Sequence, residues 1–475
     1  MVSSEAVPFS KSGGLADVAS SLSIALSALD NDVRLVIPGY GSTDDSLFTS
    51  LPHMAEIPIG GKTERVRFKQ LEDQGITVYL VDHPWFSGRK GIYGKTSYTP
   101  YGDNLLRFTL FSKAALALCK ALDWIPEIVH GHDWTTGFLP SLTKSEKAFQ
   151  NSIVVFTIHN LAYQGVFPRL DLLLSAMPID QTLLEGKGTD QRTNMLKAAI
   201  ENADILTTVS PTYAKEIQEV EQGCNLNTLL HSRADRLFGI LNGIDTVEWD
   251  PSGDRLLDTH FSIEDLSGKA VLKEKMQKRF GLPLKKDVPV ISMISRIADQ
   301  KGFVELLQGM PCALEQIVTD FSVQILIIGT GEKTLEDKLM ALAELHDNLS
   351  VNLIFSNEAA HLVEAGSDFF LMPSRYEPCG LNQMYSLRYG TIPIARQTGG
   401  LTDSVIDIDE GEGTGFLFKT MSGTAIYEAV ERAITLYASD PATISSIRKR
   451  GMAVDFSWRN SAEEYMTVYR YVKEG

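Results

Sequence analysis

The chain has 475 residues, of which 44% are hydrophobic and 22% charged, as in a globular protein with a large core. This length predicts about two to three domains. The formal net charge of −16 disfavours nucleic acid or an anionic membrane as partner, so an anionic ligand would need a local basic site. The sequence contains no apolar run of about 18 residues, and we therefore expect no membrane span.

The N-terminus lacks the basic and apolar segments of a secretory signal. Four cysteines lie far apart and form neither a C-x-x-C motif nor a zinc-binding pattern: Cys119, Cys224, Cys312 and Cys379. Cysteines spaced in this way indicate reduced thiols. We therefore expect a cytoplasmic protein.

The first elements of the chain form an incomplete βαβ unit. Residues 1–5 provide only the end of a strand, whereas a strand normally has about five or six residues. A helix with one apolar stripe follows up to Leu29, and residues 33–38 form the next strand. We expect the shortened first strand, which would be central, to lower stability. The sequence alone leaves open whether this short start is native or truncated.

Alternating elements continue through the first half of the chain. Strands are predicted at 75–81, 128–131, 153–158 and 205–209, and helices at 104–122 and 193–201. This alternation predicts a mostly parallel sheet with helices on both faces. The pattern pauses around residues 239–245, and the polar segment that follows indicates a domain boundary.

A second alternating series begins after this boundary. Strands are predicted at 290–294, 323–328, 351–355, 369–372, 392–395 and 415–418, and a long helix runs from about Ser461 to Lys473. The predicted fold class is α/β, with two Rossmann-like doubly wound domains facing an interdomain cleft. We assign residues 1–243 to the N-terminal domain and 244–456 to the C-terminal domain, with 457–475 crossing back onto the first.

One loop of the second half combines a carboxylate with a possible anion site. Pro373 ends a buried apolar strand, Glu377 follows, and a helix starts near Gly380. Ligands of α/β sheets bind at such strand-to-helix loops, and the N–H groups of Gly380 and Leu381 would suit an anion. An isolated Glu at this position would more often only cap its helix.

Two other loops carry cations. Lys11 precedes Gly13 and Gly14, which allow a phosphate or sugar to approach the backbone, although a plain glycine turn is about equally compatible. Arg296 and Lys301 follow the first strand of the second half, where they favour diphosphate binding over an ordinary basic surface. No P-loop and no G-x-G-x-x-G follows a strand, which disfavours NTP hydrolysis and dinucleotide oxidoreduction. A second Gly-Gly-Leu turn at 399–401 is expected to have local geometry similar to that at 13–15.

Histidines end two strands of the first half. His130, His132 and Asp133 lie in one segment, and His159 and Asn160 lie in the other. A metal site is the less favoured interpretation because no clustered carboxylates complete it. We expect hydrogen bonds to a sugar here, while His130 and His132 are equally compatible with buried core histidines.

Together these motifs resemble the glycogen/starch synthase family of glycosyltransferases, and in particular its bacterial, ADP-glucose-using branch. The resemblance covers nearly the whole chain and is most specific in Pro-Ser-Arg-Tyr-Glu-Pro-Cys-Gly-Leu-x-Gln at 373–383. Asn382 departs from the β-branched hydroxyl residue often found there. The other shared motifs are Lys-x-Gly-Gly-Leu-x-Asp at 11–17, Tyr-x-Asp-Asn-x-x-Arg-Phe at 101–108, His-Asp-Trp at 132–134, Thr-x-His-Asn-Leu-Ala-Tyr-Gln-Gly at 157–165, Asn-Gly-Ile-Asp at 242–245, Ser-Arg…Gln-Lys-Gly at 295–302 and Tyr-Gly-Thr…Thr-Gly-Gly-Leu at 389–401.

The resemblance implies a GT-B fold and the transfer of glucose from ADP-glucose to the non-reducing end of an α-1,4-glucan such as glycogen. It implies retention of the anomeric configuration, and neither a metal nor a cofactor. The implied catalytic residues are Lys11 near the glucose and diphosphate, Arg296 and Lys301 at the phosphates, Glu377 at the glucosyl hydroxyls, and His159 at the anomeric centre.

The resemblance also implies a set of substrate-binding residues. Asp133 would line the sugar pocket, Asn242 would contact the glucosyl group, and Phe355 would stack on adenine. Gly380, Leu381 and Gly400 would supply backbone contacts. The other substrate-binding positions are Gly13, Gly14, Asp17, Tyr101, Asn160, Cys379 and Gly399.

Several alternatives stay open at this point. The donor can be UDP-glucose instead, and Phe355 alone does not discriminate the two. A non-catalytic glucan-binding protein would show substitutions at the implied catalytic positions, yet these residues are present; a phosphorylase-like enzyme has no positive support. Retention can use Glu377 as a nucleophile, but we favour departure and attack on the same face. A homo-oligomer is compatible with all of these interpretations.

Overall fold

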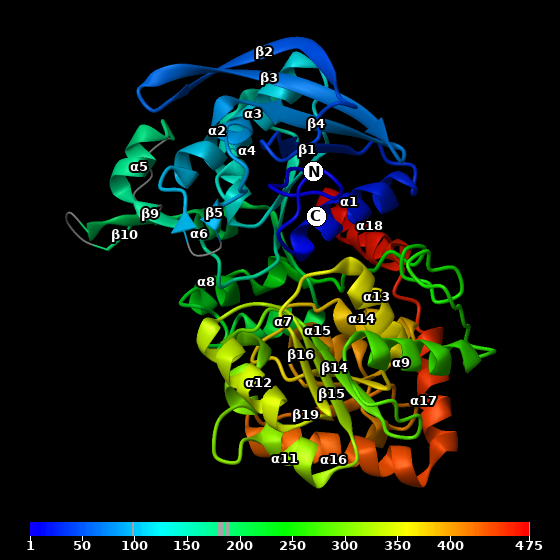
Figure 1. Ribbon diagram of the computed structural model, residues 1–475. Helices are drawn as coiled ribbons and strands as arrows, with labels where there is room; N and C mark the ends of the chain where they lie inside the picture. The colour runs from blue at the N-terminus through cyan, green and yellow to red at the C-terminus, as the bar shows by residue number, and fades with distance from the viewer. Residues whose placement is uncertain (97–98, 178–183, 187–189, 475) are drawn as a thin grey trace. The chain divides into compact units, whose positions relative to one another are not determined.

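A computed structural model of the chain describes residues 1–96, 99–177, 184–186 and 190–474 (Figure 1). The chain divides into two compact units, which are Met1–Gly243 with Trp458–Gly475 (unit 1) and Ile244–Ser457 (unit 2). None of the described helices combines the length and the apolar composition that crossing a membrane requires. It stays a prediction that unit 1 binds the glucan and unit 2 binds the nucleotide sugar.

Unit 1 is organised around parallel strands with helices between them. Its main strands are β1 (Arg34–Pro38), β2 (Thr49–Ile59), β3 (Lys62–Asp73), β4 (Ile76–Asp82), β7 (Ile128–His132), β8 (Ile153–Ile158), β12 (Ile205–Thr208) and β13 (Leu237–Gly239). Short strands are β5 (Gly94–Thr96), β6 (Thr99–Pro100), β9 (Val166–Pro168), β10 (Leu184–Glu185) and β11 (Arg192–Asn194). The helices are α1 (Gly14–Ser27), α2 (Pro84–Ser87), α3 (Asn104–Ala121), α4 (Leu139–Ser145), α5 (Arg169–Leu174), α6 (Met195–Asn202), α7 (Pro211–Glu216), α8 (Asn227–Ser232) and α18 (Trp458–Glu474).

A single residue joins the two halves of the unit 1 sheet. The halves have the strand orders β1-β4-β3-β2 and β13-β12-β8-β7. Val2 forms parallel bridges to Val36 in β1 and to Gly131 in β7, and its N–H donates to the His130 carbonyl at 2.8 Å. Val2 thus lies between the two halves and joins them into one sheet. The effect of this short first segment on stability stays a prediction.

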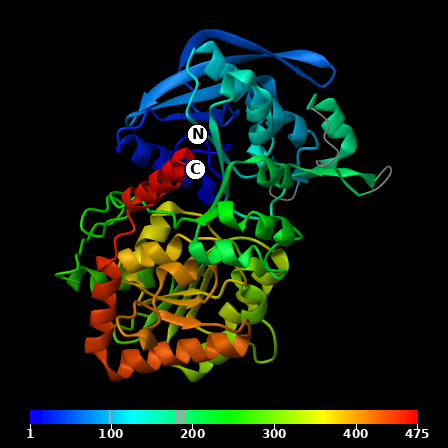
Figure 2. The same cartoon turned by 180° about the vertical axis from the view of Figure 1, so that it is seen from behind.

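The C-terminal helix α18 belongs to unit 1 and packs along α1. Figures 1 and 2 show the two helices side by side from both directions, and α1·α18 is a contact pair. The apolar stripe predicted for α1 is buried, and it meets Ala462 and Tyr465 of α18 in one hydrophobic cluster. The last helix, which was predicted to cross back onto the first half, packs against α1 in this cluster.

The hairpin formed by β2 and β3 was not predicted. It is antiparallel and turns at Gly60 and Gly61, which both have positive φ (63° and 73°), as tight hairpin turns require. β2 contains Pro52 and Pro58, which argue against a strand in the sequence, and it tolerates them because it lies at the edge of the sheet. The sheet is therefore parallel only from β4 inward.

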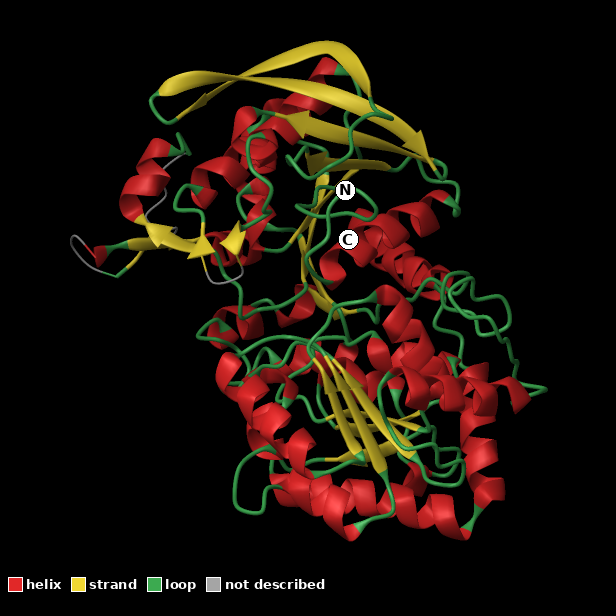
Figure 3. Ribbon diagram, viewed as in Figure 1, coloured by secondary structure: helices red, strands yellow, loops and turns green. Residues whose placement is uncertain are grey.

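Unit 2 contains a six-stranded parallel sheet. Its strands are β14 (Val290–Ile294), β15 (Gln324–Ile328), β16 (Leu349–Asn352), β17 (Phe369–Met372), β18 (Ile392–Arg396) and β19 (Phe416–Phe418). The helices, which Figure 3 shows on both faces of this sheet, are α9 (Ser267–Arg279), α10 (Phe303–Leu306), α11 (Ala313–Asp320), α12 (Lys333–Leu345), α13 (Asn357–Gly366), α14 (Asn382–Arg388), α15 (Gly399–Ser404), α16 (Gly423–Ser439) and α17 (Pro441–Ala453). All neighbouring strands pair in parallel, and their continuous apolar runs are buried because helices cover both faces.

One predicted strand of unit 2 was placed too late. The prediction for 351–355 is wrong, because β16 spans Leu349–Asn352 and ends where its partner β15 ends, at the Ile328–Asn352 pair. Beyond that pair the Gly329 N–H still donates to the Asn352 carbonyl at 3.1 Å, and the Asn352 carbonyl also accepts the N–H of Ile354, so the chain turns away from the ladder there. Phe355 consequently lies outside the strand, and its side chain is 97% exposed.

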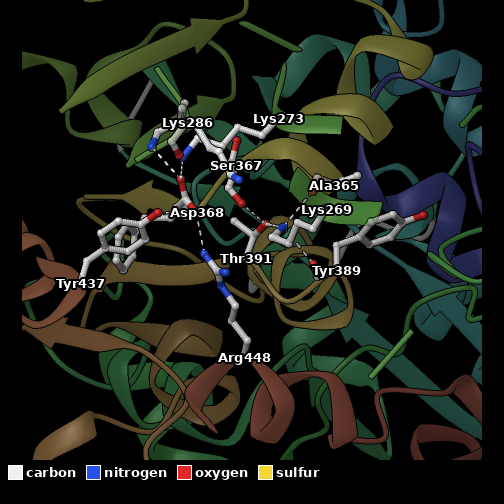
Figure 4. Close-up of polar contacts among 12 residues, drawn as sticks. Lys269, Lys273, Lys286, Ala365, Ser367, Asp368, Tyr389, Thr391, Tyr437 and Arg448 are labelled. Carbon is white, nitrogen blue, oxygen red and sulfur yellow. Dashed lines mark hydrogen bonds and ion pairs between the residues drawn. The ribbon is translucent and has the colours of Figure 1, made fainter. Parts of the chain in front are cut away.

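A buried ionic cluster fixes the start of β17 (Figure 4). The Asp368 carboxylate forms ion pairs with Lys273 at 2.7 Å and with Arg448 at 2.6 Å. It also accepts a hydrogen bond from the backbone N–H of Val290 at 3.0 Å. Lys269 lies beside this cluster and donates to the carbonyls of Ala365 and Tyr389 and to the Thr391 hydroxyl. The cluster ties helices α9 and α17 to the strand whose other end leads to Glu377.

Candidate active site

The strand order of unit 2 defines where a ligand would bind. The order β16-β15-β14-β17-β18-β19 reverses direction between β14 and β17, and these two strands pair directly. Open parallel sheets bind ligands outside the carboxyl ends of strands at such a switch point. The loop after β14 carries Arg296 and Lys301, and the loop after β17 carries Glu377. The structure therefore brings the predicted cations and the predicted carboxylate to one place.

Lys301 and Glu377 are in direct contact within this site. The Lys301 Nζ lies 2.5 Å from Oε2 of Glu377, and the Ser374 hydroxyl donates to the same oxygen at 3.0 Å. The Glu377 side chain is 8% exposed and that of Lys301 is 21% exposed. Glu377 is therefore an oriented carboxylate in an ion pair, and not a simple helix cap.

Arg375 joins the two loops on which this pair depends. Its guanidinium contacts Asp299 at 3.0 Å and also pairs with the largely buried Glu305, while its backbone N–H donates to the Gln300 carbonyl at 2.8 Å. Gly302, at φ 80°, has no room for a side chain, because an added Cβ would lie 2.1 Å from the Pro373 carbonyl. Arg375 was not among the predicted site residues, although it lies inside the most specific motif.

Glycines close the back of the Glu377 loop. A Cβ on Gly399 or Gly400 would lie 2.0 Å or 2.1 Å from the carbonyls of Glu377 and Cys379, respectively. The Gly400 N–H donates to the Glu377 carbonyl at 3.1 Å, so Gly400 supports the loop and its N–H is used internally. The backbone contact from Gly400 to a ligand that the resemblance implied stays a prediction.

The start of α14 is held by one buried amide. The Gln383 Nε2 donates to the carbonyls of Cys379 and Gly380 and to the Ser404 hydroxyl, each at 3.0 Å. Gly380 has φ 74°, a conformation that favours glycine, and it precedes Leu381 at the helix start. Asn382, the departure from the family pattern, donates to the Ile294 carbonyl at 2.7 Å and so links α14 to the end of β14.

Two predicted residues of unit 2 are largely open to solvent. Arg296 is exposed, and among the described residues its guanidinium hydrogen-bonds only to the Gln300 side chain, at 3.5 Å. Phe355 is also exposed and follows β16 at the same edge of the sheet. Neither side chain contributes much to the core, so both are available to a ligand.

In unit 1, Lys11 lies on a loop that a buried glutamate organises. Lys11 forms an ion pair with Asp17 of α1 at 2.7 Å, with its side chain 50% exposed. The carboxylate of Glu5 accepts the backbone N–H groups of Ser12 and Gly13 and the Ser12 hydroxyl, and it also contacts the Tyr93 hydroxyl. Glu5 therefore occupies the N–H of Gly13, one of the two glycines at which a ligand was expected to approach the backbone.

The two Gly-Gly-Leu turns differ, contrary to expectation. Gly13 has φ −161°, which is extended backbone, and an added Cβ there would meet nothing within 4 Å. Gly399 instead has φ 45° and touches neighbouring backbone. Both turns start a helix, with Gly14 as the first residue of α1, but only the second is sterically demanding.

His159 and Asp133 meet at the carboxyl ends of β8 and β7. The Asp133 Oδ1 accepts the His159 backbone N–H at 2.8 Å, and His159 Nε2 lies 3.0 Å from Nδ1 of His132. Burial raises the pKa of Asp133 to about 7 and lowers the pKa of His159 to about 3. His159 is therefore neutral at physiological pH, and His132 is a neighbour whose role the motif alone did not reveal.

Of three remaining predicted residues, Tyr101 and Asn160 have mainly structural contacts and Asn242 does not. Tyr101 lies under the guanidinium groups of Arg89 and Arg107, at 4.7 Å and 5.0 Å from its ring centroid. Asn160 accepts the Ala162 N–H at 3.0 Å in a tight turn. The buried Oδ1 of Asn242 has no hydrogen-bond partner among the described residues, which leaves it available to a ligand.

The predicted residues thus form one group in unit 2 and two groups in unit 1. Unit 2 brings Lys301, Glu377, Cys379, Gly399 and Gly400 together, and unit 1 brings Asp133 together with His159 and, separately, Lys11 with Asp17. Within the described part of the chain, no group of three or more His, Cys, Asp or Glu side chains is arranged to hold a metal ion.

Segments of both units match known protein families. Residues 1–232 match the family described as starch synthase catalytic domain, and residues 274–450 match glycosyl transferases group 1. A glycogen synthase of Treponema denticola is 41% identical, with 99% of this chain and 97% of that protein covered. A glycogen synthase of Anaeromyxobacter sp. is 44% identical, with coverage of 99% and 98%.

Solved structures show the same architecture. The catalytic domain of starch synthase IV from Arabidopsis thaliana, bound to ADP and acarbose, matches with a TM-score of 0.89 and 32% identity, covering 100% of this chain and 99% of that one. Sucrose-phosphate synthase from Thermosynechococcus elongatus matches with a TM-score of 0.61 at 17% identity, covering 100% and 99%, which shows the fold alone.

Proposed function

Since the chain belongs to the glycogen synthase family of glycosyltransferases, with the predicted GT-B fold of two Rossmann-like units confirmed, we propose that it transfers glucose from ADP-glucose to a glucan. The acceptor is the non-reducing end of an α-1,4-glucan such as glycogen, and the new linkage retains the α configuration. The observation that carries this proposal is the group of Arg296, Lys301 and Glu377 at the switch point of unit 2.

The two cations fit the charge that develops during the transfer. Breaking the bond between glucose and diphosphate places negative charge on the leaving ADP, and fixed cations stabilise that charge in a partly buried site. Arg296 can fork onto phosphate oxygens, and Lys301 adds a point charge. This pair supplies the stabilisation that a divalent metal would otherwise supply, and we therefore propose transfer without a metal or a cofactor.

Glu377 fits a role in orienting the sugar. Its Oε2 accepts two hydrogen bonds, from Lys301 and Ser374, and a carboxylate stabilised in this way is a weak nucleophile. This supports departure of ADP and attack of the acceptor on the same face, with an ADP oxygen taking the acceptor proton. Lys11, His159, Asp133 and Asn242 of unit 1 would contact the glucosyl group and the diphosphate.

We also propose a cytoplasmic location. Among the described residues the cysteines form no disulfide, as expected of a protein kept in a reducing compartment. A homo-oligomer is compatible with the proposal but has no separate support.

Glucose incorporation into glycogen tests the proposed donor. The purified protein is incubated with glycogen and radiolabelled ADP-glucose or UDP-glucose, side by side and with EDTA present. We expect strong incorporation from ADP-glucose that EDTA does not reduce. Preference for UDP-glucose would overturn the donor, loss of activity in EDTA would overturn metal independence, and glycogen binding without incorporation would favour a non-catalytic glucan-binding protein.

A further inference from the structure

Three histidine rings lie in contact at the carboxyl ends of β7 and β8. The rings of His130 and His132 stack with centroids 4.3 Å apart, and the ring of His132 lies 5.2 Å from that of His159. His130 and His132 are fully buried, and His159 is 9% exposed. Of these three histidines, only His159 is therefore partly exposed to solvent.

His130 has a partner at each ring nitrogen. Its Nδ1 lies 2.7 Å from the Tyr469 hydroxyl on α18, and its Nε2 lies 2.6 Å from the Thr157 hydroxyl. His130 is therefore a buried core histidine whose two ring nitrogens both have hydrogen-bond partners. This is one of the two interpretations that the sequence left open. It anchors the ring of His132 by stacking and competes for neither of that ring's nitrogens.

His132 has a partner at only one nitrogen. Its Nδ1 lies 3.0 Å from Nε2 of His159, whereas its own Nε2 is buried and has no partner among the described residues. If Nε2 carried the proton, a buried N–H would be left without an acceptor. A buried N–H without a partner is rarer in proteins than an unused acceptor lone pair. The proton of neutral His132 therefore belongs on Nδ1.

We propose that His132 is a positioning residue that fixes the tautomer of His159 for glucosyl transfer. Its Nδ1–H donates to Nε2 of His159, which must then carry its own proton on Nδ1. Among the described residues none accepts a hydrogen bond from that Nδ1–H. His159 accordingly presents a fixed, neutral hydrogen-bond donor, suited to an oxygen of the glucosyl group. This last point rests on the function proposed above, whereas the tautomer does not.

The electrostatics of the group agree with this assignment. Burial lowers the pKa of His159 to about 3 and the pKa values of His130 and His132 well below the usual range. All three rings are then neutral at physiological pH, and each carries one N–H proton, on either Nδ1 or Nε2. A neutral His159 cannot act as a cationic acid, so its contribution depends on which nitrogen carries its proton.

The tautomer is directly measurable by NMR of the full-length protein with ¹⁵N-labelled histidine. The His159 signals are assigned by their loss in His159→Asn. Chemical shifts and two-bond couplings to the ring protons distinguish a protonated from an unprotonated ring nitrogen. We expect Nδ1 of His159 to be protonated and Nε2 to be unprotonated. A protonated Nε2 would overturn the proposal, whatever the activity of the protein.

A matched pair of variants tests the consequence for catalysis. In His132→Asn the side-chain amide can occupy the position of Nδ1 and still donate to His159, whereas in His132→Gln it reaches towards the position of Nε2. We expect His132→Asn to keep the wild-type tautomer and most of the turnover. His132→Gln should lose both, with kcat reduced by about tenfold, the effect of one oriented hydrogen bond.

The two proposals fail in different ways. Equal kcat and equal His159 signals in the Asn and Gln variants would contradict the positioning role, provided that thermal unfolding shows both to be folded. If either variant does not fold, the NMR measurement on the wild type decides alone. Absence of glucosyl transfer by the wild type would instead contradict the proposed function and leave the tautomer assignment intact.

Discussion

The Nζ of Lys301 lies 2.5 Å from Oε2 of Glu377, so the lysine expected at the leaving diphosphate is held by the carboxylate expected at the sugar. The two residues are 76 positions apart and come from loops after adjacent strands. A diphosphate that binds here must either share Lys301 with Glu377 or take the place of Glu377 as the partner of Lys301. The donor affinity and the turnover are therefore coupled through this pair.

Glu377→Gln separates these two properties. Without the negative charge, Lys301 is released to the phosphates, so we expect ADP to bind as tightly as to the wild type, or up to about tenfold more tightly. Turnover should fall by about 100-fold or more, because an oriented charge at the reacting sugar is lost. Calorimetric titration with ADP, next to the transfer assay, measures both. Weaker ADP binding by a folded variant would contradict the coupling.

Arg296→Ala should weaken ADP binding without affecting stability. The side chain is exposed, and Gln300, at 3.5 Å, is its only hydrogen-bond partner in the part of the chain that the structure describes, so its removal should leave the melting temperature unchanged. Loss of a hydrogen bond to a charged group should raise the Kd for ADP by about 10- to 100-fold and lower the rate. Lys338→Ala, on the exposed face of α12, is the matched control. Equal ADP affinity in the two variants would remove Arg296 from the phosphate site.

Glu5→Ala should destabilise the loop that carries Lys11. Glu5 is 2% exposed and its carboxylate accepts hydrogen bonds from Ser12, Gly13 and Tyr93, all of which would be lost. We expect the free energy of unfolding to fall by about 1–3 kcal/mol. Glu56→Ala removes an exposed ion pair with Arg65 and should cost less than about 1 kcal/mol. Denaturant titration compares the two, and equal losses would contradict the role of Glu5.

Asp368→Asn should destabilise unit 2 by about 3–5 kcal/mol at neutral pH, because Lys273 and Arg448 would stay buried without their counter-charge. Burial by itself would raise the pKa of Asp368, but the charges of Arg448 and Lys273 hold that pKa below its usual value. Since the folded-state pKa is depressed, the stabilisation is present above the unfolded pKa of about 4 and is lost as pH falls through the lower folded value.

Unfolding of the wild type and Asp368→Asn at several pH values checks this sign. The difference in stability should be full at pH 6 to 8 and should shrink below about pH 4. A difference that stayed constant into acid would show that the charge of Asp368 is not the source of the stabilisation.

The sequence predicted most of the fold because the parallel strands are short apolar runs separated by helices. The order of those strands in the sheet could not be predicted from the sequence. This order places the loops of Arg296 and Glu377 side by side. The hairpin of β2 and β3 escaped prediction because an edge strand tolerates proline. The predicted end of one strand, at Phe355, was wrong because the length of a strand depends on its partner.

The candidate site was predictable only residue by residue. Motifs identified Lys301 and Glu377 separately, but their ion pair depends on tertiary structure. The same holds for Glu5, which looks like an ordinary residue near the N-terminus and yet contacts Tyr93, 88 positions later. The unpartnered nitrogen of buried His132 could likewise be recognised only once its surroundings were known.

The most direct test of the central claim is the product formed from ADP-glucose and maltotetraose, a short α-1,4-glucan. Proton NMR of the reaction follows the anomeric signals as they form. We predict maltopentaose with a new α-1,4 linkage at the non-reducing end and one ADP released for each glucose transferred. A β linkage, free glucose without elongation, or an unchanged acceptor would contradict the proposed retaining glucosyl transfer.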